Sequence, residues 1–287
     1  MRIKSRKKND FVIRLGEKIL YLKVRTYIMG VINRTPDSFS KDGLYLDDKE
    51  AIKRIESFKE NGCDILDIGG ESTRPGSLNV DEAEEIKRTI PFIRILKRKF
   101  DLPISIDTTR SKVAELALSE GACVVNDISG LKNDPEMAKV IARHNAAVIL
   151  MHCKGEPKTM QENPAYKDLI KEIIKSLRES IKIALRAGIK ENRIIVDPGI
   201  GFGKTLAHNL QILKNIDKFE VLNKPILIGV SRKSFIGNVL NLPVQERIFG
   251  TAASVAWAVS KGANIIRVHD VREMAQVAKL IDSIKKA

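Results

Sequence analysis

The sequence predicts a (β/α)8 barrel preceded by a β-hairpin, and three observations favour this fold class. Short apolar runs alternate with longer segments whose apolar residues recur at helical spacing. Eight such pairs fit within roughly 250 residues, the usual size of this barrel. Glycine often stands between a helical segment and the next strand, where it suits a left-handed helix cap. Apolar strands that alternate with helices indicate a parallel sheet covered by helices.

The first 26 residues are expected to form a basic N-terminus and a β-hairpin. Two apolar runs, at 11–15 and 19–24, flank a turn at 16–18. We expect this hairpin to plug the bottom of the barrel. Because no linker interrupts the later sequence, residues 27–287 are expected to form one barrel domain.

The eight expected strands are short and mostly apolar. They cover residues 27–32, 65–68, 103–107, 124–127, 147–152, 194–197, 226–231 and 265–268. The segments between them carry apolar residues on one helical face, as Ile52, Ile55 and Phe58 do in the first. These segments cover residues 47–61, 81–99, 109–120, 134–144, 165–187, 206–219 and 244–260, with a last one at 270–285.

Composition narrows the class of protein. Of the 287 residues, 43% are hydrophobic, which supports a substantial core. No apolar run approaches the roughly 20 residues that span a bilayer, and no signal-peptide core follows the basic start. We therefore expect a cytoplasmic protein without a membrane partner.

The formal net charge of +14 has two interpretations. Lysine and arginine are spread along amphipathic stretches, which indicates solvated helix faces and a diffuse attraction for phosphate-bearing ligands. The alternative is a non-catalytic barrel that binds nucleic acid, with an affinity that falls steeply as salt rises. Aromatic residues make up only 5% of the chain and are not interleaved with basic clusters, so we expect no nucleic-acid partner.

The cysteines do not predict a metal or catalytic site. Cys63, Cys123 and Cys153 are odd in number, far apart and without the paired spacing of a zinc site. We expect free thiols that are buried or half-buried. His152 is adjacent to Cys153, but neighbours on a strand point to opposite faces, which disfavours a catalytic pair.

A glycine-rich stretch follows the sixth expected strand. Gly203, Lys204 and Thr205 resemble the end of a phosphate-binding loop, but that motif needs glycine where Pro198 stands. Proline offers no N–H to a phosphate and fixes its own φ, so the nucleotide interpretation fails. We expect Lys204 and Thr205 to be ordinary residues of a helix start. Asp197, at the end of a buried strand, is where α/β folds bind ligands.

Four polar residues at strand ends predict a site for a flat heterocycle. Asp107, Asn126, Asp197 and Lys233 provide two carboxylates, an amide and an ammonium group. Together they would pair with N–H donors on one edge of such a ring and a carbonyl on another. For a single member the alternative is a helix N-cap, as Asp107 would be before the next helical segment.

A second set of strand-end residues predicts a site for phosphate. Thr73, Arg74, Arg267 and His269 offer hydroxyl, guanidinium and imidazolium donors, and Asn33 offers an amide oxygen to a Mg²⁺ shell. Two positions separate Arg267 from His269, so both are expected on the same side of an extended chain, facing one anion.

The motifs around these residues resemble dihydropteroate synthases, the pterin-binding (β/α)8 barrels of folate biosynthesis. The matching stretches follow the family order from about residue 27 to the C-terminus. They are MGVIN at 29–33, TPDSFS at 35–40, DIGGESTRPG at 67–76, ISIDT at 104–108, VND at 125–127, MH at 151–152, VDPGIGFGK at 196–204, SRKSFIG at 231–237 and RVHDV at 267–271.

The resemblance implies a Mg²⁺-dependent transferase that condenses hydroxymethyl-dihydropterin pyrophosphate with p-aminobenzoate and releases pyrophosphate. It also implies a homodimer formed through late helices. Carried over residue by residue, the implied roles are pterin binding by Asp107, Asn126, Asp197 and Lys233; pyrophosphate binding by Thr73, Arg74, Arg267 and His269; a p-aminobenzoate pocket of Phe39, Pro75, Phe202, Lys233 and Ser234; and a Mg²⁺ contact from Asn33.

The sequence departs from the family pattern in its first loop. Lys41 stands where the family commonly has an aspartate, and Asp42 follows it, so no role is assigned to Asp42. Arg34 replaces a small apolar residue. The alternative function is methyl transfer from a methylated folate to a corrinoid protein on the same kind of barrel. That reaction has no use for the basic residues at 231–234 or for Arg267 and His269.

Overall fold

The computed structural model describes residues 12–35, 47–71, 80–155, 160 and 164–287. Parallel strands form its central sheet. They are β3 (Tyr27–Asn33), β4 (Ile65–Gly69), β5 (Ile104–Asp107), β6 (Val124–Asp127), β7 (Ala147–Met151), β8 (Ile194–Asp197), β9 (Leu227–Gly229) and β10 (Ile265–Val268). These are the eight strands expected from the sequence, each within a few residues of its expected bounds.

The sheet closes on itself. Hydrogen bonding joins the strands in the order β8-β7-β6-β5-β4-β3-β10-β9. The two ends of this order meet at a parallel bridge between Val196 of β8 and Ile226 beside β9. There the Val196 N–H donates to the Pro225 carbonyl at 2.9 Å. The predicted barrel fold is therefore confirmed.

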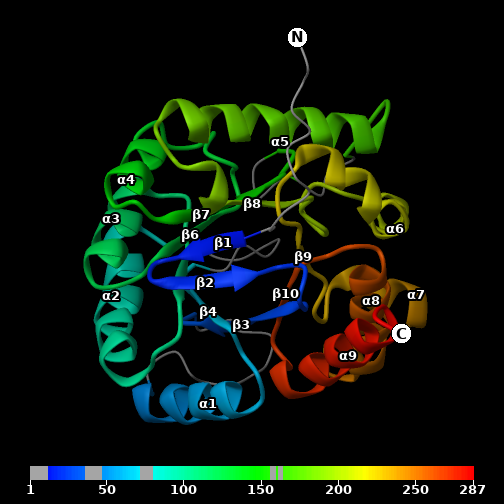
Figure 1. Ribbon diagram of the computed structural model, residues 1–287, viewed down its shortest axis with the longest axis horizontal. Coiled ribbons are helices and arrows are strands. Elements are labelled where there is room, and N and C mark those ends of the chain that lie inside the picture. Colours follow the sequence, from blue (N-terminus) through cyan, green and yellow to red (C-terminus); the bar gives the residue numbers. More distant parts are fainter. Residues whose placement is uncertain (1–11, 36–46, 72–79, 156–159, 161–163) are drawn as a thin grey trace.

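Helices surround the barrel (Figure 1). They are α1 (Asp48–Glu60), α2 (Glu82–Lys99), α3 (Ser111–Ser119), α4 (Met137–Arg143), α5 (Leu169–Arg186), α6 (Leu206–Lys214), α7 (Ser234–Leu240), α8 (Ile248–Ser260) and α9 (Val271–Ile284), with 3-10 turns at Glu191–Arg193, Ile216–Leu222 and Val244–Glu246. The sequence did not predict α7, and the segment expected at 206–219 is divided into α6 and a 3-10 turn. No helix in the described ranges is long and apolar enough to cross a membrane.

Glycines end several of the helices as predicted. Gly62, Gly121 and Gly262 directly follow the C-caps of α1, α3 and α8, and all three have positive φ angles of 89°, 109° and 100°. A left-handed residue at this position satisfies the last helical carbonyls and turns the chain sharply toward the next strand. The short connections to β4, β6 and β10 follow from this.

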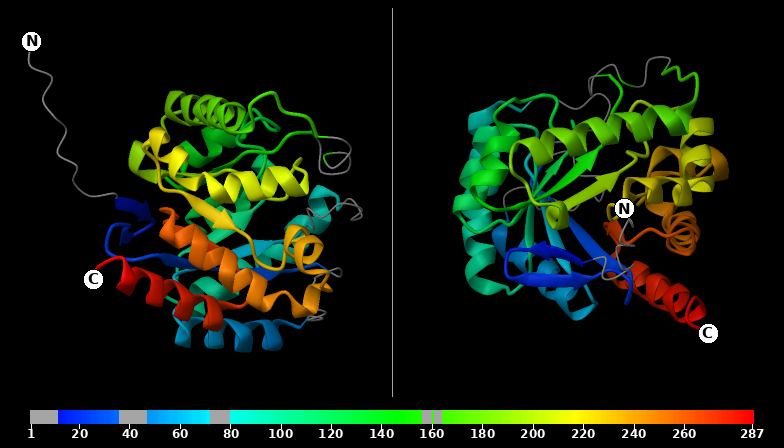
Figure 2. Two further views of the ribbon diagram at one scale, coloured as in Figure 1. Left: turned by 90° about the vertical axis from the view of Figure 1, so that its right-hand side faces the viewer. Right: turned by 45° about the horizontal axis from the view of Figure 1, so that its top comes forward.

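The hairpin covers the N-terminal end of the barrel (Figures 1 and 2). It consists of β1 (Val12–Leu15) paired antiparallel with β2 (Lys18–Tyr21). Ile13, Leu15 and Leu20 are buried against residues near the starts of the barrel strands. Each such side chain contributes about 1.5–3 kcal/mol by leaving water. The predicted plug at the barrel bottom is thus confirmed.

Candidate active site

On four strands, the inward-facing residue near the start is apolar and the inward-facing residue two positions later is polar. Because alternate residues face the same side of a strand, both members of each pair point into the barrel. The pairs, apolar residue first, are Ile65 and Asp67, Val124 and Asn126, Ile195 and Asp197, and Ile265 and Arg267. The polar members lie toward the C-terminal ends of the strands, where barrels of this class bind their ligands.

Arg267 connects two carboxylates in this polar layer. Its Nε atom donates to Asp67 Oδ2 at 2.6 Å, and its Nη2 atom donates to Asp107 Oδ2 at 2.7 Å. Asn126 Nδ2 donates to the same Asp67 oxygen at 3.2 Å. Burial opposes the charge of Arg267, but Asp67 and Asp107 outweigh it and raise the pKa of the guanidinium above its usual range. Among the described residues, the Nη1 atom of Arg267 has no hydrogen-bond partner.

Asp107 is not a helix cap. The N-cap of α3 is Arg110, and no side chain caps that helix. Burial raises the pKa of Asp107 to about 7; Arg267 opposes this rise, whereas the like charge of Asp67 adds to it. The carboxyl group therefore changes its charge near neutral pH, where its Arg267 contact and a ligand N–H would both favour the ionised form.

The second strand-end carboxylate is oriented by the glycine-rich stretch. The Gly199 N–H donates to Asp197 Oδ1 at 2.7 Å. Burial raises the pKa of Asp197, and the nearby Lys233 ammonium opposes that rise. Asp197 thus keeps one carboxylate oxygen, Oδ2, without a hydrogen bond from the described part of the chain.

Lys233 faces the same stretch from the other side. Its Nζ atom donates to the Ile200 carbonyl and lies 4.8 Å from the centre of the Phe202 ring, within the range of a cation–π contact. Burial lowers the pKa of Lys233 to about 8, and Asp197 opposes the change. Ser234 follows directly as the first residue of α7. Lys233 therefore lies against the Phe202 ring, with Ser234 beside it at the start of α7.

Arg232, between Ser231 and Lys233, has a left-handed backbone with φ 55°. This conformation costs an ordinary residue about 1–2 kcal/mol. Four hydrogen bonds hold it: two from its guanidinium to Asp270 at 2.9 and 2.6 Å, one from its N–H to Thr251 Oγ1 at 3.0 Å, and one from Arg247 to its carbonyl at 3.1 Å. A strained residue held from several sides is typical of functional sites.

Without a bound anion, the surroundings of His269 disfavour its protonated, imidazolium form. Burial, followed by the positive charge of Arg267, lowers the pKa of His269 to about 3. Its Nδ1 atom lies 3.0 Å from Ser231 Oγ. Arg267, for its part, binds two carboxylates rather than projecting freely toward an anion. A bound phosphate would supply the negative charge that favours a protonated His269.

The remaining predicted residues divide into two groups. Phe39, Thr73, Arg74 and Pro75 lie outside the described residues. Asn33 is the last residue of β3 and is paired with Gly69 of β4. Gly69 is in turn paired with Asp107 of β5, so Asn33 lies in the same row of the sheet as the predicted pterin ligand Asp107.

The described residues contain no group of three or more His, Cys, Asp or Glu side chains placed to hold a metal ion. Mg²⁺ favours six oxygen ligands and keeps several waters, and it is commonly held by one or two protein groups together with substrate phosphates. A single amide oxygen from Asn33 fits a Mg²⁺ ion that is held mainly by substrate phosphates and water. It does not fit a metal ion that is held by the protein alone.

Sequence inspection missed two residues of this region. Asp67 has no exposed surface and pairs with Arg267, and its other oxygen has no partner in the described structure. A carboxylate inside an apolar strand was the available signal. Lys204 is not an ordinary helix-start residue, because it is only 2% exposed and donates to His152 and Phe202. Thr205 caps α6 as expected.

The cysteines agree with their prediction. Cys63 is buried, and Cys123 and Cys153 are partly exposed; all three are free thiols. Burial raises the pKa of each, to about 12 for Cys63, so none carries the low pKa of a reactive cysteine.

Comparison with known proteins places the barrel in a family. The family described as pterin binding enzyme matches residues 29–269, most of the chain, so the barrel is a pterin-binding enzyme. A curated dihydropteroate synthase from Clostridium beijerinckii is 48% identical over 95% of this chain and 99% of its own length, and one from Bacillus subtilis is 44% identical over 95% and 93%.

Solved structures agree. A dihydropteroate synthase of Yersinia pestis, in complex with a sulfonamide drug, superposes with a TM-score of 0.93 at 38% identity, covering 96% of this chain and all of that one. One of Xanthomonas albilineans, with 4-aminobenzoic acid, has a TM-score of 0.89 at 35% identity and covers 97% of this chain and all of its own. The chain belongs to the dihydropteroate synthase family. The alternative methyl-transfer function is not favoured.

Proposed function

We propose that the residues at the C-terminal end of the barrel carry out a dihydropteroate synthase reaction in the following roles. The reaction joins the methylene carbon of hydroxymethyl-dihydropterin pyrophosphate to the amino nitrogen of p-aminobenzoate and releases pyrophosphate. The observation that carries the proposal is the hydrogen-bonded, largely buried group of Asp67, Asp107, Asn126 and Arg267, in a chain whose relatives over nearly its whole length are dihydropteroate synthases.

The pterin ring would lie between the two strand-end carboxylates. Asp107 and Asp197 accept hydrogen bonds from the N–H groups of the ring, Asn126 offers both a donor and an acceptor, and Lys233 donates to the ring carbonyl. The Oδ2 atom of Asp197, which accepts no hydrogen bond from the described residues, supports this role. The same carboxylates favour the positive charge that develops on the pterin methylene as pyrophosphate leaves.

The departing pyrophosphate needs neutralisation of charge, because it is already a good leaving group and requires no protein nucleophile. Arg267, through its Nη1 atom, and His269 would contact its oxygens, and Thr73 and Arg74 would contribute further donors. Mg²⁺, held by Asn33 and the substrate phosphates, would supply further positive charge to the same oxygens.

The p-aminobenzoate would occupy a neighbouring pocket. The Phe202 ring supplies an apolar wall, Phe39 and Pro75 would complete it, and Ser234 would donate to the carboxylate. Lys233 lies against the Phe202 ring and would donate to the pterin carbonyl, so it would belong to both substrate sites. This connection orders the second substrate against the first.

Pyrophosphate release tests the function. The purified chain should release pyrophosphate only when the pterin substrate, p-aminobenzoate and Mg²⁺ are all present. A folded protein that fails to release pyrophosphate under these conditions would overturn the proposal. The Arg267→Ala variant should lose more affinity for the pterin pyrophosphate substrate than for free pterin. Equal losses of affinity would contradict the role of Arg267.

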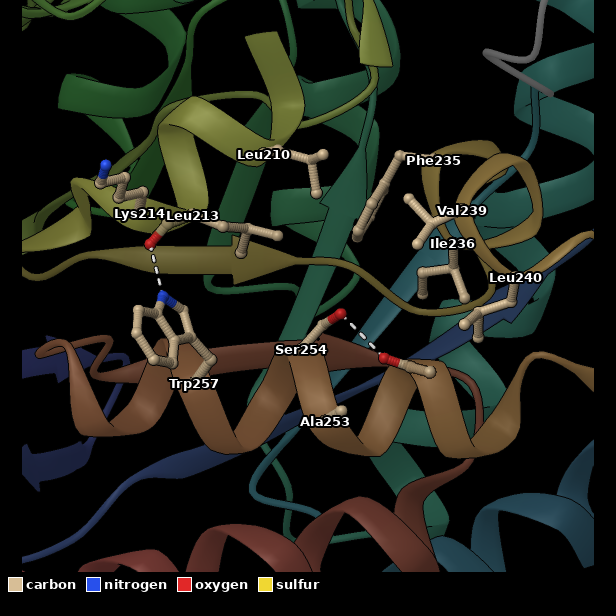
Figure 3. Close-up of a pocket in the computed structure, with 11 residues that line it drawn as sticks. Leu210, Leu213, Lys214, Phe235, Ile236, Val239, Leu240, Ala253, Ser254 and Trp257 are labelled. Atoms are coloured by element: carbon tan, nitrogen blue, oxygen red, sulfur yellow. Dashed lines mark hydrogen bonds between the residues drawn. The ribbon is translucent and has the colours of Figure 1, made fainter. Parts of the chain in front are cut away.

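A homodimer through α7 and α8 is part of the proposal. A groove of about 410 Å³ lies between α6, α7 and α8, and Leu210, Val239 and Trp257 contribute apolar side chains to it (Figure 3). Phe249, at the start of α8, is 85% exposed. Apolar surface of this kind marks a binding face, and in a twofold dimer the same patch meets itself.

Light scattering of the protein as it elutes from a sizing column measures the oligomeric state. The wild-type chain should have the mass of two copies, and Phe249→Ser should shift it toward one. A wild-type monomer would contradict the dimer. The cytoplasmic location stays a prediction from the sequence.

A further inference from the structure

The loop after β8 carries two groups that contact Lys233. We name residues 198–203 the glycine loop. Its Ile200 carbonyl accepts a hydrogen bond from Lys233 Nζ, and its Phe202 ring lies 4.8 Å from the same atom. The position of this loop therefore decides where Lys233 and the Phe202 ring lie relative to each other.

The glycine loop lies directly on the backbone of the segment that follows β7. A Cβ atom on Gly199 would be 1.9 Å from the His152 carbonyl oxygen, and one on Gly203 would be 2.2 Å from the Lys154 carbonyl oxygen. Both glycines also have positive φ angles, of 71° and 64°. Only glycine fits at these two points, so the two backbones are in close contact at both ends of the loop.

Lys204 forms hydrogen bonds to both backbones of this contact. Its Nζ atom donates to His152 Nδ1 at 3.0 Å, to the His152 carbonyl at 3.3 Å and to the Phe202 carbonyl at 2.8 Å. In its charged form Lys204 has three donors, one for each of these contacts. Burial lowers the pKa of Lys204 to about 7. Burial and the charge of Lys204 lower the pKa of His152 to about 2, which favours a neutral ring, and its tautomer with hydrogen on Nε2 accepts this bond at Nδ1.

We infer that Lys204 is a positioning residue that holds the glycine loop against His152 and thereby sets the place of Phe202 and Lys233 for the aminobenzoate substrate. This inference rests on the proposed function. Lys204 reaches the two sides of the contact at once, since His152 follows β7 and Phe202 belongs to the loop itself. A buried lysine is otherwise rare in proteins unless it is paired.

Other contacts hold the loop without Lys204, which makes the inference testable in a folded protein. The Gly201 N–H donates to Asn209 Oδ1 at 2.7 Å, and the Tyr166 hydroxyl donates to the Gly203 carbonyl at 2.8 Å. The loop should therefore keep its general path when Lys204 is replaced, while the Phe202 end loosens.

The test is Lys204→Met, which keeps most of the length of the side chain and removes its three hydrogen bonds. Steady-state kinetics should show a KM for p-aminobenzoate raised about tenfold, because small misplacements of positioning groups are costly. The Kd of the pterin substrate should rise by a smaller factor, about threefold, because Asp107 and Asn126 do not touch the glycine loop whereas Asp197 and Lys233 do. Hydrogen exchange of the amides at 199–203 should become faster. Lys171→Met, at an exposed lysine of α5, is the matched control and should change none of these.

Tyr166→Phe is a milder second variant that removes one loop contact and should shift the KM for p-aminobenzoate in the same direction by a smaller factor. An unchanged KM in a folded Lys204→Met protein, or equal losses for both substrates, would overturn the inference. So would unchanged amide exchange. Failure of the proposed function is distinguishable, because the wild-type chain would then release no pyrophosphate while the exchange comparison still reports on the loop.

Discussion

The two ends of the barrel are built from the same strands, but one end is packed with apolar residues and the other carries the charged residues of the site. On β10 the inward residue near the start is Ile265, packed beneath the hairpin, and two positions later it is Arg267, bonded to two carboxylates. On β4 the same step leads from Ile65 to Asp67. One strand thus contributes stability at its first residues and chemistry at its last.

The energetics of the two layers differ accordingly. Each buried aliphatic residue at the hairpin end stabilises the fold by about 1.5–3 kcal/mol. A buried ion cluster such as that of Arg267, Asp67 and Asp107 gives little net stability compared with apolar residues of similar volume, because each charge loses its water. The charged layer is therefore better explained by ligand binding than by folding.

We expect the largest effect from Arg267→Ala. This change leaves Asp67 and Asp107 without their cation, which costs about 3–5 kcal/mol of unfolding free energy, and it should also abolish turnover. Denaturant unfolding near neutral pH measures the first effect. Ile265→Val on the same strand is the control, with a cost of about 0.5–1.5 kcal/mol and unchanged KM values. An Arg267→Ala protein as stable as wild type would break the contrast between the two ends.

Leu20→Ala should destabilise the chain by about 2–4 kcal/mol without changing its kinetics. Leu20 is buried between the hairpin and the strand starts, and its truncation leaves a cavity there. Unfolding and steady-state kinetics on the same preparation check both parts. If Leu20→Ala also changed the KM values, the hairpin end of the barrel would affect substrate binding as well as stability.

The affinity for pterin should depend on pH through two groups. Below pH 7 Asp107 becomes protonated, since its pKa is about 7, and the carboxylate acceptor is lost. Binding should then weaken by up to tenfold, about 1.4 kcal/mol, for each pH unit. Above pH 8 Lys233 loses its charge, since its pKa is about 8. Calorimetry should find the tightest binding between these values, and Asp107→Asn should flatten the acid limb to the part that Asp197, whose pKa is also raised, contributes. Affinity that rises steadily as pH falls would contradict the role of Asp107.

The smallest expected effect concerns the turn at Arg232. Thr251→Val keeps the shape of a buried side chain and removes the acceptor of the Arg232 N–H, at a cost of about 1–2 kcal/mol. The KM values should rise only a few-fold. Arg232→Gly tolerates the left-handed backbone, whereas Arg232→Ala retains the strain, so glycine should be the less harmful of the two. The opposite order would show that the backbone conformation is not under strain.

The sequence predicted the repeating framework because helix, glycine and apolar strand recur with local signals. Each strand was found within a few residues, and the contact between Asp107 and Arg267 agrees with their expected places at strand ends. Asp67 was missed because it precedes the strand end, and nothing local shows that its partner, Arg267, lies 200 residues away. Lys204 precedes a helix, and nothing local in the sequence shows that its acceptor His152 lies after another strand. Helix α7 is too short to show a helical repeat.

The polar end of the barrel is proposed to hold a pterin between Asp107 and Asp197, and every other role in the site depends on this. Titration calorimetry of wild type and Asp197→Ala with the pterin pyrophosphate substrate tests it most directly. We predict one substrate bound per wild-type chain and no detectable binding to a folded Asp197→Ala variant. Wild-type affinity in that variant would contradict the proposed pterin site.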